Sequence, residues 1–393
     1  MKAAVQQYRP DISDGDHLIG AFVGDASGPT LIAVGSVHGN EPAGARALLV
    51  IAEQLRQMAS DLNGRVYLLA GNTRALRENV RYIDRDLNRA WTPANMSSLR
   101  SKRARATSEC RELDELDRTI DQILITARSE VFVLDLHSTS AGGEPFATVG
   151  DTLRNRAFAQ KFPVTILLGI EEQLEGTMLE YLNNAGAVTM GFEGGSHTSE
   201  HTFDNHTALV WLALLNAGIL SENEIPELDR HRATLAAGKT RARVVEVRYR
   251  KGITADDGFK MNAGFNNFDP ITAGQILAND RSGEVRATER GLILMPLYQP
   301  LGEDGFFIGR EVAPFWLVVS GLLRRLRAQK LMTWLPGVRQ ESGDPDTLIV
   351  DTRLARFFPL QIFHLLGYRR RRWADRKLVV SRRKHDTVSP FTQ

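Results

Sequence analysis

Short runs of apolar residues recur along the first 220 residues, with longer mixed segments between them. Five runs have the length and composition of buried β-strands: Leu31–Val34, Arg65–Ala70, Val131–Leu136, Val164–Leu168 and Ala187–Phe192. Three intervening segments have the apolar spacing of amphipathic helices: Ala43–Gln57, Arg111–Arg128 and Asp204–Ala217. This alternation predicts an α/β fold, with helices on both faces of a central sheet.

The pattern changes after about residue 220. Ser221–Leu228 is polar and contains Pro226, which is typical of a boundary. Residues 240–312 carry short strand-like runs separated by glycines, which predicts a small β-rich domain. We therefore expect a catalytic α/β domain over 1–225, a β-rich domain over 240–312, and a basic C-terminal extension or small appended domain over 313–393.

The C-terminal extension admits three interpretations. Leu317–Leu335 looks helical and mixes apolar with basic residues, so it can lie on a membrane surface. The basic residues from Arg369 to Lys384 can bind an acidic partner or nucleic acid. We favour a small appended domain, because VAPFWLVV, TLIVDT and KLVVSRR contain strand-like runs that need a core.

Composition narrows the class of protein. The chain has 393 residues, 42% of them hydrophobic, which is enough for a sizeable core. The net charge of +2 gives no chain-wide attraction for nucleic acid, so we expect none as a partner. The single cysteine, Cys110, excludes an internal disulfide and a cysteine metal cluster.

The terminus and the apolar runs bear on location. The first 16 residues contain no apolar core of signal-peptide length. The longest late apolar run, Val312–Leu323, is too short to span a bilayer. We therefore expect a cytoplasmic protein without a membrane span, and the sequence leaves a homo-oligomer open.

The sequence LIAVGSVHGNE, residues 31–41, places an imidazole and a carboxylate after the first predicted strand. His38 and Glu41 are three residues apart, and Pro42 fits the first turn of the next helix. Active sites of α/β sheets lie at the carboxyl ends of strands. Zinc binds imidazole nitrogen and carboxylate oxygen, and catalytic sites combine three such ligands with an open position. The pair therefore predicts a site for one divalent ion, with a third ligand from elsewhere.

His137 is the candidate third ligand, because it also ends a predicted strand. Asp135, two positions earlier, should point to the same side, where it can orient a metal-bound imidazole. A single histidine at a strand end is more often a hydrogen-bonded structural residue. Its place on the same predicted rim as His38 and Glu41 favours the metal interpretation.

Glu193 follows the last of the five strands and opens into two glycines. Its carboxylate can take a proton from a metal-bound water and pass it to a leaving nitrogen. A helix-capping or loop role is an equally good interpretation of this residue alone.

Residues 72–91 form a predicted long loop dense in arginine and asparagine. Guanidinium groups suit carboxylate recognition and oxyanion stabilisation, although a solvated charged loop is the usual alternative. Three histidines, His197, His201 and His206, come later, and HTSEH lacks the glutamate of the metalloprotease zinc helix. For these histidines we favour supporting or surface roles over a second metal site.

Four blocks together resemble the succinylglutamate desuccinylase/aspartoacylase family of the zinc carboxypeptidase superfamily: HGNE at 38–41, RYIDRDLNR at 81–89, DLHST at 135–139 and GFEGG at 191–195. The resemblance covers roughly residues 28–310. It implies a mixed sheet between helices, and a smaller β domain that narrows the pocket. It implies one zinc ion per chain, bound by His38, Glu41 and His137. It also implies that Glu193 is the general base and proton donor and that Arg81 polarises the scissile carbonyl. Asn88 and Arg89 are implied as ligands of the substrate carboxylate.

The resemblance implies a zinc-dependent amidohydrolase that cleaves an N-acyl amino acid, with metal-bound water as nucleophile. One alternative is a zinc carboxypeptidase acting on short or cell-wall peptides. The other is a metal-free binding module, and the intact set of site residues argues against that module. Two departures bear on substrate. Leu182–Asn184 stands where aspartoacylases carry an arginine, and Gly302–Phe307 stands where they carry a tyrosine, so Phe306 or Phe307 replaces its hydroxyl. The acyl group and the amino acid therefore stay open.

Overall fold

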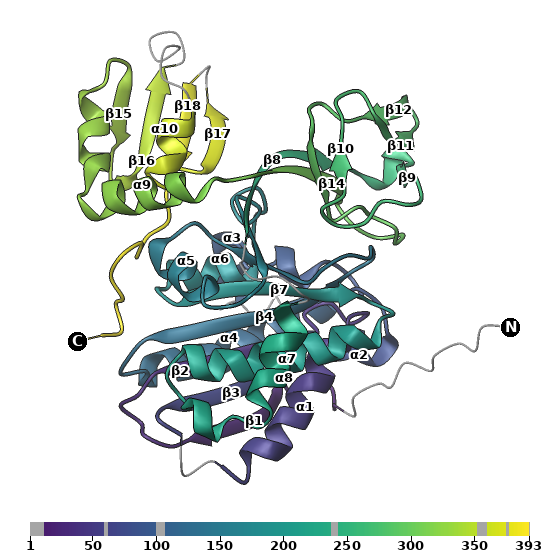
Figure 1. The fold of residues 1–393 in the computed structure, drawn as a ribbon, viewed down its shortest axis with the longest axis vertical. Coiled ribbons are helices and arrows are strands. Elements are labelled where there is room, and N and C mark those ends of the chain that lie inside the picture. Colours follow the sequence, from purple (N-terminus) through teal and green to yellow (C-terminus); the bar gives the residue numbers. More distant parts are fainter. Residues whose placement is uncertain are drawn as a thin grey trace, which may run out of the picture.

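The computed structural model describes residues 12–58, 62–99, 107–236, 243–351, 360–374 and 377–392 (Figure 1). The first eleven residues, the predicted domain start at 240 and Arg376 lie outside these ranges, as do the side chains of Arg370–Arg372. The predicted division into three domains stays a prediction.

Within the described residues, an eleven-stranded mixed sheet forms the centre of the molecule, in the order β1-β3-β2-β4-β7-β5-β6-β8-β14-β13-β10. Strands β3, β2, β4 and β7 are parallel neighbours, whereas β1 and β5 pair antiparallel with β3 and β7. The strands of its first half are β1 (Leu18–Val23), β2 (Thr30–Gly35), β3 (Arg65–Ala70), β4 (Val131–Thr139), β5 (Phe146–Val149), β6 (Thr165–Leu168) and β7 (Val188–Ser196).

Helices cover both faces of this sheet. The long ones are α1 (Ala43–Leu55), α4 (Ser108–Thr126) and α7 (Glu200–Asn216), and the short ones are α2 (Thr73–Glu78), α3 (Pro93–Leu99), α5 (Leu153–Ala159), α6 (Met178–Asn184) and α8 (Leu228–Ala236). The chain also forms 3-10 turns, of which η2 (Leu87–Arg89) lies near the site described below.

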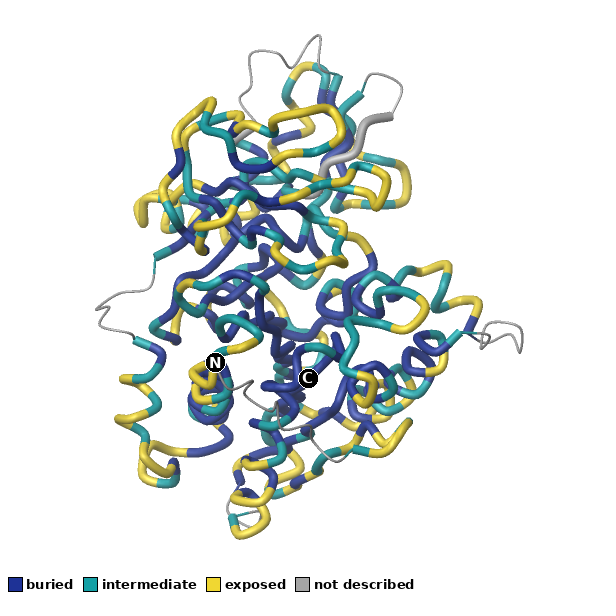
Figure 2. The backbone as a smooth tube through the Cα atoms, turned by 90° about the vertical axis from the view of Figure 1, so that its right-hand side faces the viewer, coloured by how far each residue is buried: buried dark blue, intermediate teal, exposed yellow. Residues whose placement is uncertain are grey.

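Alternate residues of β2 pack on opposite faces of the sheet. Leu31 and Ala33 join a core with α1, α5 and α7. Ile32 and Val34 join a second core with α4 and α6. Buried residues accordingly concentrate along the central sheet (Figure 2). The predicted α/β fold with a mixed sheet and helices on both faces is confirmed.

A β-rich segment extends the sheet and adds a small sheet of its own. Strand β8 (Val244–Gly252) pairs with β6 on one side and with β14 (Asp304–Glu311) on the other, so this segment is joined to the central sheet. The remaining strands are β9 (Lys260–Met261), β10 (Pro270–Ile271), β11 (Ile276–Asp280), β12 (Gly283–Arg286) and β13 (Gly291–Leu294), of which β12, β11 and β9 form the separate sheet.

The C-terminal part has a four-stranded antiparallel sheet, in the order β15-β16-β18-β17. Its elements are α9 (Pro314–Arg325), η6 (Ala328–Trp334), β15 (Val338–Glu341), β16 (Asp344–Asp351), α10 (Leu360–Leu365), β17 (Arg370–Ala374) and β18 (Lys377–Ser381). The expectation of a strand-like run in VAPFWLVV is wrong, since proline at the first helical position begins α9 there. The parts of TLIVDT and KLVVSRR over Thr347–Asp351 and Lys377–Ser381 do form strands β16 and β18, and Thr352 lies outside the described residues. Among the described residues, no helix has both the length and the apolar character needed to cross a membrane.

Candidate metal centre and active site

The turn between β2 and α1 fixes His38 and Glu41. Ser36, with φ of 60°, adopts the left-handed conformation, and its hydroxyl donates a hydrogen bond to the Glu41 carbonyl at 2.9 Å. A Cβ on Gly39 would lie 2.1 Å from the backbone of Ala75. Only glycine therefore lets this turn lie against α2. Both side chains emerge at the carboxyl end of β2.

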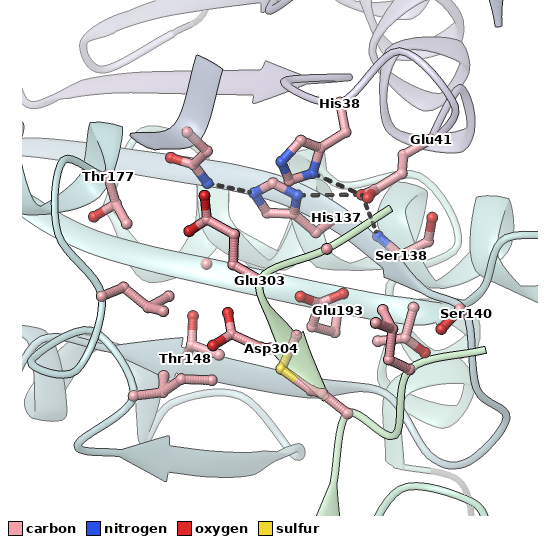
Figure 3. Close-up of a pocket in the computed structure, with 18 of the residues that line it drawn as sticks. His38, Glu41, His137, Ser138, Ser140, Thr148, Thr177, Glu193, Glu303 and Asp304 are labelled. Carbon is pink, nitrogen blue, oxygen red and sulfur yellow. Dashed lines mark hydrogen bonds and ion pairs between the residues drawn. The ribbon is translucent and has the colours of Figure 1, made fainter. Parts of the chain in front are cut away.

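Three side chains converge on one point at this edge of the sheet (Figure 3). The Nδ1 atom of His38 lies 3.0 Å from Oε1 of Glu41, and Nδ1 of His137 lies 3.2 Å from Oε2 of the same carboxylate. One ligand atom from each residue lies within 4.8 Å of the other two, and all three residues are buried. The structure therefore brings together the three residues that we predicted as metal ligands.

The second ring nitrogen of each histidine faces an aspartate. Nε2 of His137 lies 2.8 Å from Oδ2 of Asp135, and Nε2 of His38 lies 3.1 Å from Oδ1 of Asp86. Two imidazoles oriented by carboxylates, together with a third carboxylate, form a donor set that suits zinc. The position of Asp135 agrees with the sequence analysis, whereas the contact of Asp86 was missed. Its only signal was an acidic residue inside an arginine-rich block.

The charges of this cluster support one another. Burial works against ionisation of Glu41, yet His38 and His137 hold the pKa of its carboxyl well below the usual value. Burial likewise works against the charge on His137, but Asp135 and Glu41 hold the pKa of the imidazole well above its usual value. Glu41 is thus kept as a carboxylate, the form that binds a metal.

Glu193 lines the same pocket from β7. Strands β4 and β7 are parallel, and His137 and Glu193 are register partners, so their side chains leave the sheet on the same face (Figure 3). Burial raises the pKa of Glu193 to about 7. Its Oε2 atom is buried and has no hydrogen-bond partner within the described ranges. A carboxyl group of this kind suits proton transfer near neutral pH.

The arginine-rich segment is partly helical, because α2 and η2 interrupt the predicted long loop. It places Arg81, Asn88 and Arg89 on the pocket wall. Arg81 Nη2 lies 3.0 Å from Oδ2 of Asp86, and Nη1 lies 3.6 Å from Oε1 of Glu41. Burial opposes the charge, but Asp86 and Glu41 hold the pKa of Arg81 above its usual value.

Asn88 and Arg89 are each held by a hydrogen bond to a different part of the chain. The Asn88 side-chain oxygen accepts a hydrogen bond from the Met178 backbone N–H at 3.0 Å, so its amide nitrogen faces His137 at 3.4 Å. Nη2 of Arg89 donates to Oδ2 of Asp304 at 3.2 Å. The β-rich segment thereby contributes a carboxylate that orients this guanidinium in the pocket.

The pocket itself is a cavity of about 120 Å³. Its apolar lining includes Ile170, Leu174, Leu179, Met295 and Phe307. Phe307, rather than Phe306, thus stands at the pocket, and Phe306 packs in the core of the β-rich segment. The polar part of the wall includes Glu171, whose carboxylate accepts hydrogen bonds from Thr148 and Thr177, each at 3.3 Å.

The three later histidines have supporting or surface positions. His197 Nδ1 lies 2.7 Å from the Ser138 hydroxyl, and Nε2 lies 3.2 Å from the Gln299 side chain. His206 is buried, with Nε2 at 2.9 Å from the His137 carbonyl oxygen. His201 is exposed. A second group that sequence reasoning missed, His17 with Glu112 and Glu115, also clusters.

Taken together, the chain is an α/β protein with a candidate metal centre at the carboxyl edge of a mixed sheet. Residues 27–220, about half of the chain, match the family model of the succinylglutamate desuccinylase/aspartoacylase catalytic domain, and this part of the chain belongs to that family. The predicted resemblance is confirmed.

Two curated relatives illustrate the similarity. The probable aspartoacylase of Acaryochloris marina is 35% identical over 114 residues, which cover 28% of this chain and 35% of the relative. The N-acyl-aromatic-L-amino acid amidohydrolase (carboxylate-forming) of Xenopus laevis is 29% identical over 151 residues, which cover 35% and 47%. The chain thus matches less than half the length of each.

Solved structures show the same fold. A succinylglutamate desuccinylase/aspartoacylase from Rhodobacter sphaeroides aligns with a TM-score of 0.54 and 18% identity, over 73% of this chain and 87% of that one. The ectoine utilization protein EutE (DoeB) from Ruegeria pomeroyi aligns with a TM-score of 0.52 and 22% identity, over 73% and 86%.

Proposed function

We propose that this chain is a zinc-dependent deacylase that hydrolyses the amide bond of an N-acyl amino acid. The observation that carries the proposal is the convergence of His38, Glu41 and His137 in one buried pocket with Glu193. Membership of the family and the names of the two curated relatives support the substrate class. When bound, zinc would polarise the acyl carbonyl and make water more acidic.

The protein's own side chains would divide the remaining chemistry. Glu193, with its raised pKa, takes a proton from the attacking water and then delivers it to the departing nitrogen. Arg81 donates hydrogen bonds to the oxyanion that forms on the acyl carbon. Asn88 and Arg89 bind the carboxylate of the amino-acid part and fix its distance from the reacting carbonyl.

The pocket also restricts the substrate. A cavity of about 120 Å³ suits a short acyl group. Within the described lining, Arg81 and Arg89 are the two guanidinium groups, and both already face carboxylates. A second substrate carboxylate would instead approach Glu171 and Asp304. We therefore propose a substrate with one carboxylate and an uncharged acyl group.

A groove beside the pocket supports a second candidate, carboxypeptidase action on short peptides. It measures about 1210 Å³ and runs between residues 82–86 and the β-rich segment. It shares Leu297, Gln299, Gly302 and Glu303 with the pocket wall. An extended peptide has room in this groove that a small acyl amino acid does not use.

The decisive experiment combines metal analysis with a hydrolysis screen. The protein is expressed with zinc supplied, its metal content is measured, and panels of N-acetyl amino acids and of short peptides are offered. Zinc near one per chain, with turnover of the N-acetyl amino acids, supports the deacylase. Turnover of peptides alone favours the second candidate, and a metal-free, inactive protein contradicts both.

A further inference from the structure

Helix α9 lies in the C-terminal part of the molecule (Figure 1). This helix and the turn η6 carry several large apolar side chains that are exposed. We call these residues the apolar face: Phe315, Val318, Leu322 and Leu326 along α9 and its C-cap, and Leu331 and Trp334 on η6. Phe315 is 65% exposed and Trp334 is 81% exposed. The two elements that carry these six residues are in contact with each other.

The helix is fixed so that this face points outward. Residues 315, 318, 322 and 326 follow one another at intervals of three or four, which places them on one side of the helix. The opposite side carries Ser320 and Arg324, both buried. Arg324 donates to Asp151 at 2.8 Å and to Asp386 at 2.9 Å, and these buried ion pairs hold α9 against the catalytic part of the chain.

The segment that carries the apolar face is basic. Between Glu311 and Glu341 the sequence contains no acidic residue. Arg325, Arg327 and Lys330 lie at the junction of α9 and η6, and all three are exposed. The face therefore combines aromatic and aliphatic side chains with a positively charged edge.

We propose that the apolar face docks on the surface of an anionic lipid bilayer. An interfacial helix inserts Trp, Phe and Leu among the acyl chains, while Lys and Arg contact the charged headgroups. A second copy of the chain fits less well. A two-fold contact would set the same patch against itself, and Arg325, Arg327 and Lys330 would face like charges.

Vesicle co-sedimentation of the full chain tests the proposal. The wild type is mixed with vesicles of phosphatidylcholine alone and with vesicles of equal parts phosphatidylcholine and phosphatidylglycerol. We expect binding to the anionic vesicles at low salt, with weak binding to neutral vesicles and loss at high salt. Replacing Phe315, Leu322 and Trp334 by Ser should weaken partitioning at least tenfold. The matched control replaces three exposed apolar residues elsewhere, Leu18, Ile125 and Val388, by Ser and should bind as the wild type.

A second triple variant isolates the charge. Replacing Arg325, Arg327 and Lys330 by Gln should also weaken binding to anionic vesicles at least tenfold, since each basic residue near such a surface adds about a factor of five. The control replaces three exposed arginines elsewhere, Arg230, Arg286 and Arg290, by Gln. It removes the same amount of charge and should change binding to anionic vesicles little.

Three results would overturn the proposal. The first is equal binding to neutral and anionic vesicles. The second is anionic binding that both triple variants retain. The third is a wild type that ignores vesicles but self-associates in sedimentation velocity, with self-association lost in the apolar triple. Equal thermal unfolding of all variants shows that a loss of binding does not come from a loss of folding.

Discussion

Asp135 and His137 stand two positions apart on β4, with Oδ2 of the aspartate 2.8 Å from Nε2 of the histidine. The Nε2 atom of His38 likewise faces a carboxylate, with Oδ1 of Asp86 at 3.1 Å. An outer carboxylate fixes the ring and strengthens the imidazole as a ligand, so its loss weakens metal binding. We predict that Asp135→Asn and Asp86→Asn each weaken zinc affinity by about 10–100-fold. Competition with a chelator measures this, and Asp256→Asn, at an exposed site, is the control.

Unchanged zinc affinity in both aspartate variants would show that these carboxylates do not support the ligands. A stronger result would come from His38→Ala, which removes a proposed ligand outright. It should abolish stoichiometric zinc binding, while Asp135→Asn should regain zinc when the metal is in excess.

Glu193 is expected to act on protons rather than on the metal. Glu193→Gln keeps the size and polarity of the side chain but removes the group that accepts a proton. We predict full zinc content and a loss of kcat of about 10²–10⁴-fold on an N-acyl amino acid. Glu284→Gln, on the exposed strand β12, should keep wild-type turnover. Retained turnover in Glu193→Gln would remove this residue from the mechanism, whereas lost zinc would make it a ligand.

Substrate preference should follow the carboxylates of the pocket. Glu171 is buried in the wall, and its carboxylate accepts hydrogen bonds from the hydroxyls of Thr148 and Thr177. We predict that N-acetyl amino acids with apolar side chains exceed N-succinyl amino acids in kcat/KM by about tenfold or more. Among the described residues of the pocket wall, both guanidinium groups already face carboxylates, so a second substrate carboxylate gains no new ion pair. Glu171→Gln should narrow this ratio. Equal rates on both substrates would show that the pocket does not exclude a dicarboxylate.

The sequence predicted those parts of the fold that are buried on both sides. Leu31–Val34 is a continuous apolar run because β2 lies inside a parallel sheet, covered on both faces. Strand β1 lacks this signal, since it is an edge strand with Leu18 and Val23 exposed. Strand β5 spans only Phe146–Val149, too short for a pattern to stand out.

The same distinction applies to the site. His137 directly follows an apolar run, and His38 and Glu41 lie in the short turn after another, so their place at one sheet edge can be inferred from local sequence. The contact between Asp86 and His38 depends on how the segment after β3 folds back over that edge. The buried pairs of Arg324 with Asp151 and Asp386 join residues far apart in the chain. No local pattern distinguishes Arg324 from the solvated arginines of the same segment.

The attachment of the C-terminal part should be sensitive to acid. The Oε1 atom of Glu246 on β8 lies 2.8 Å from Nδ1 of His364 and 2.5 Å from Nη1 of Arg369. Burial works against its charge, but His364 and Arg369 lower the pKa of Glu246 to about 2, from an ordinary 4.5. A carboxyl whose pKa is lower in the folded than in the unfolded chain stabilises the fold above the unfolded value. That contribution is lost as the pH falls from about 4.5 towards 2.

We predict that Glu246→Gln lowers the free energy of unfolding near neutral pH by about 2 kcal/mol. The gap to the wild type should narrow on acidification, as followed by denaturant unfolding at several pH values. The control Glu284→Gln should show the same pH dependence of unfolding free energy as the wild type. If the difference in unfolding free energy between Glu246→Gln and the wild type stays constant down to about pH 3, these ion pairs do not contribute to stability.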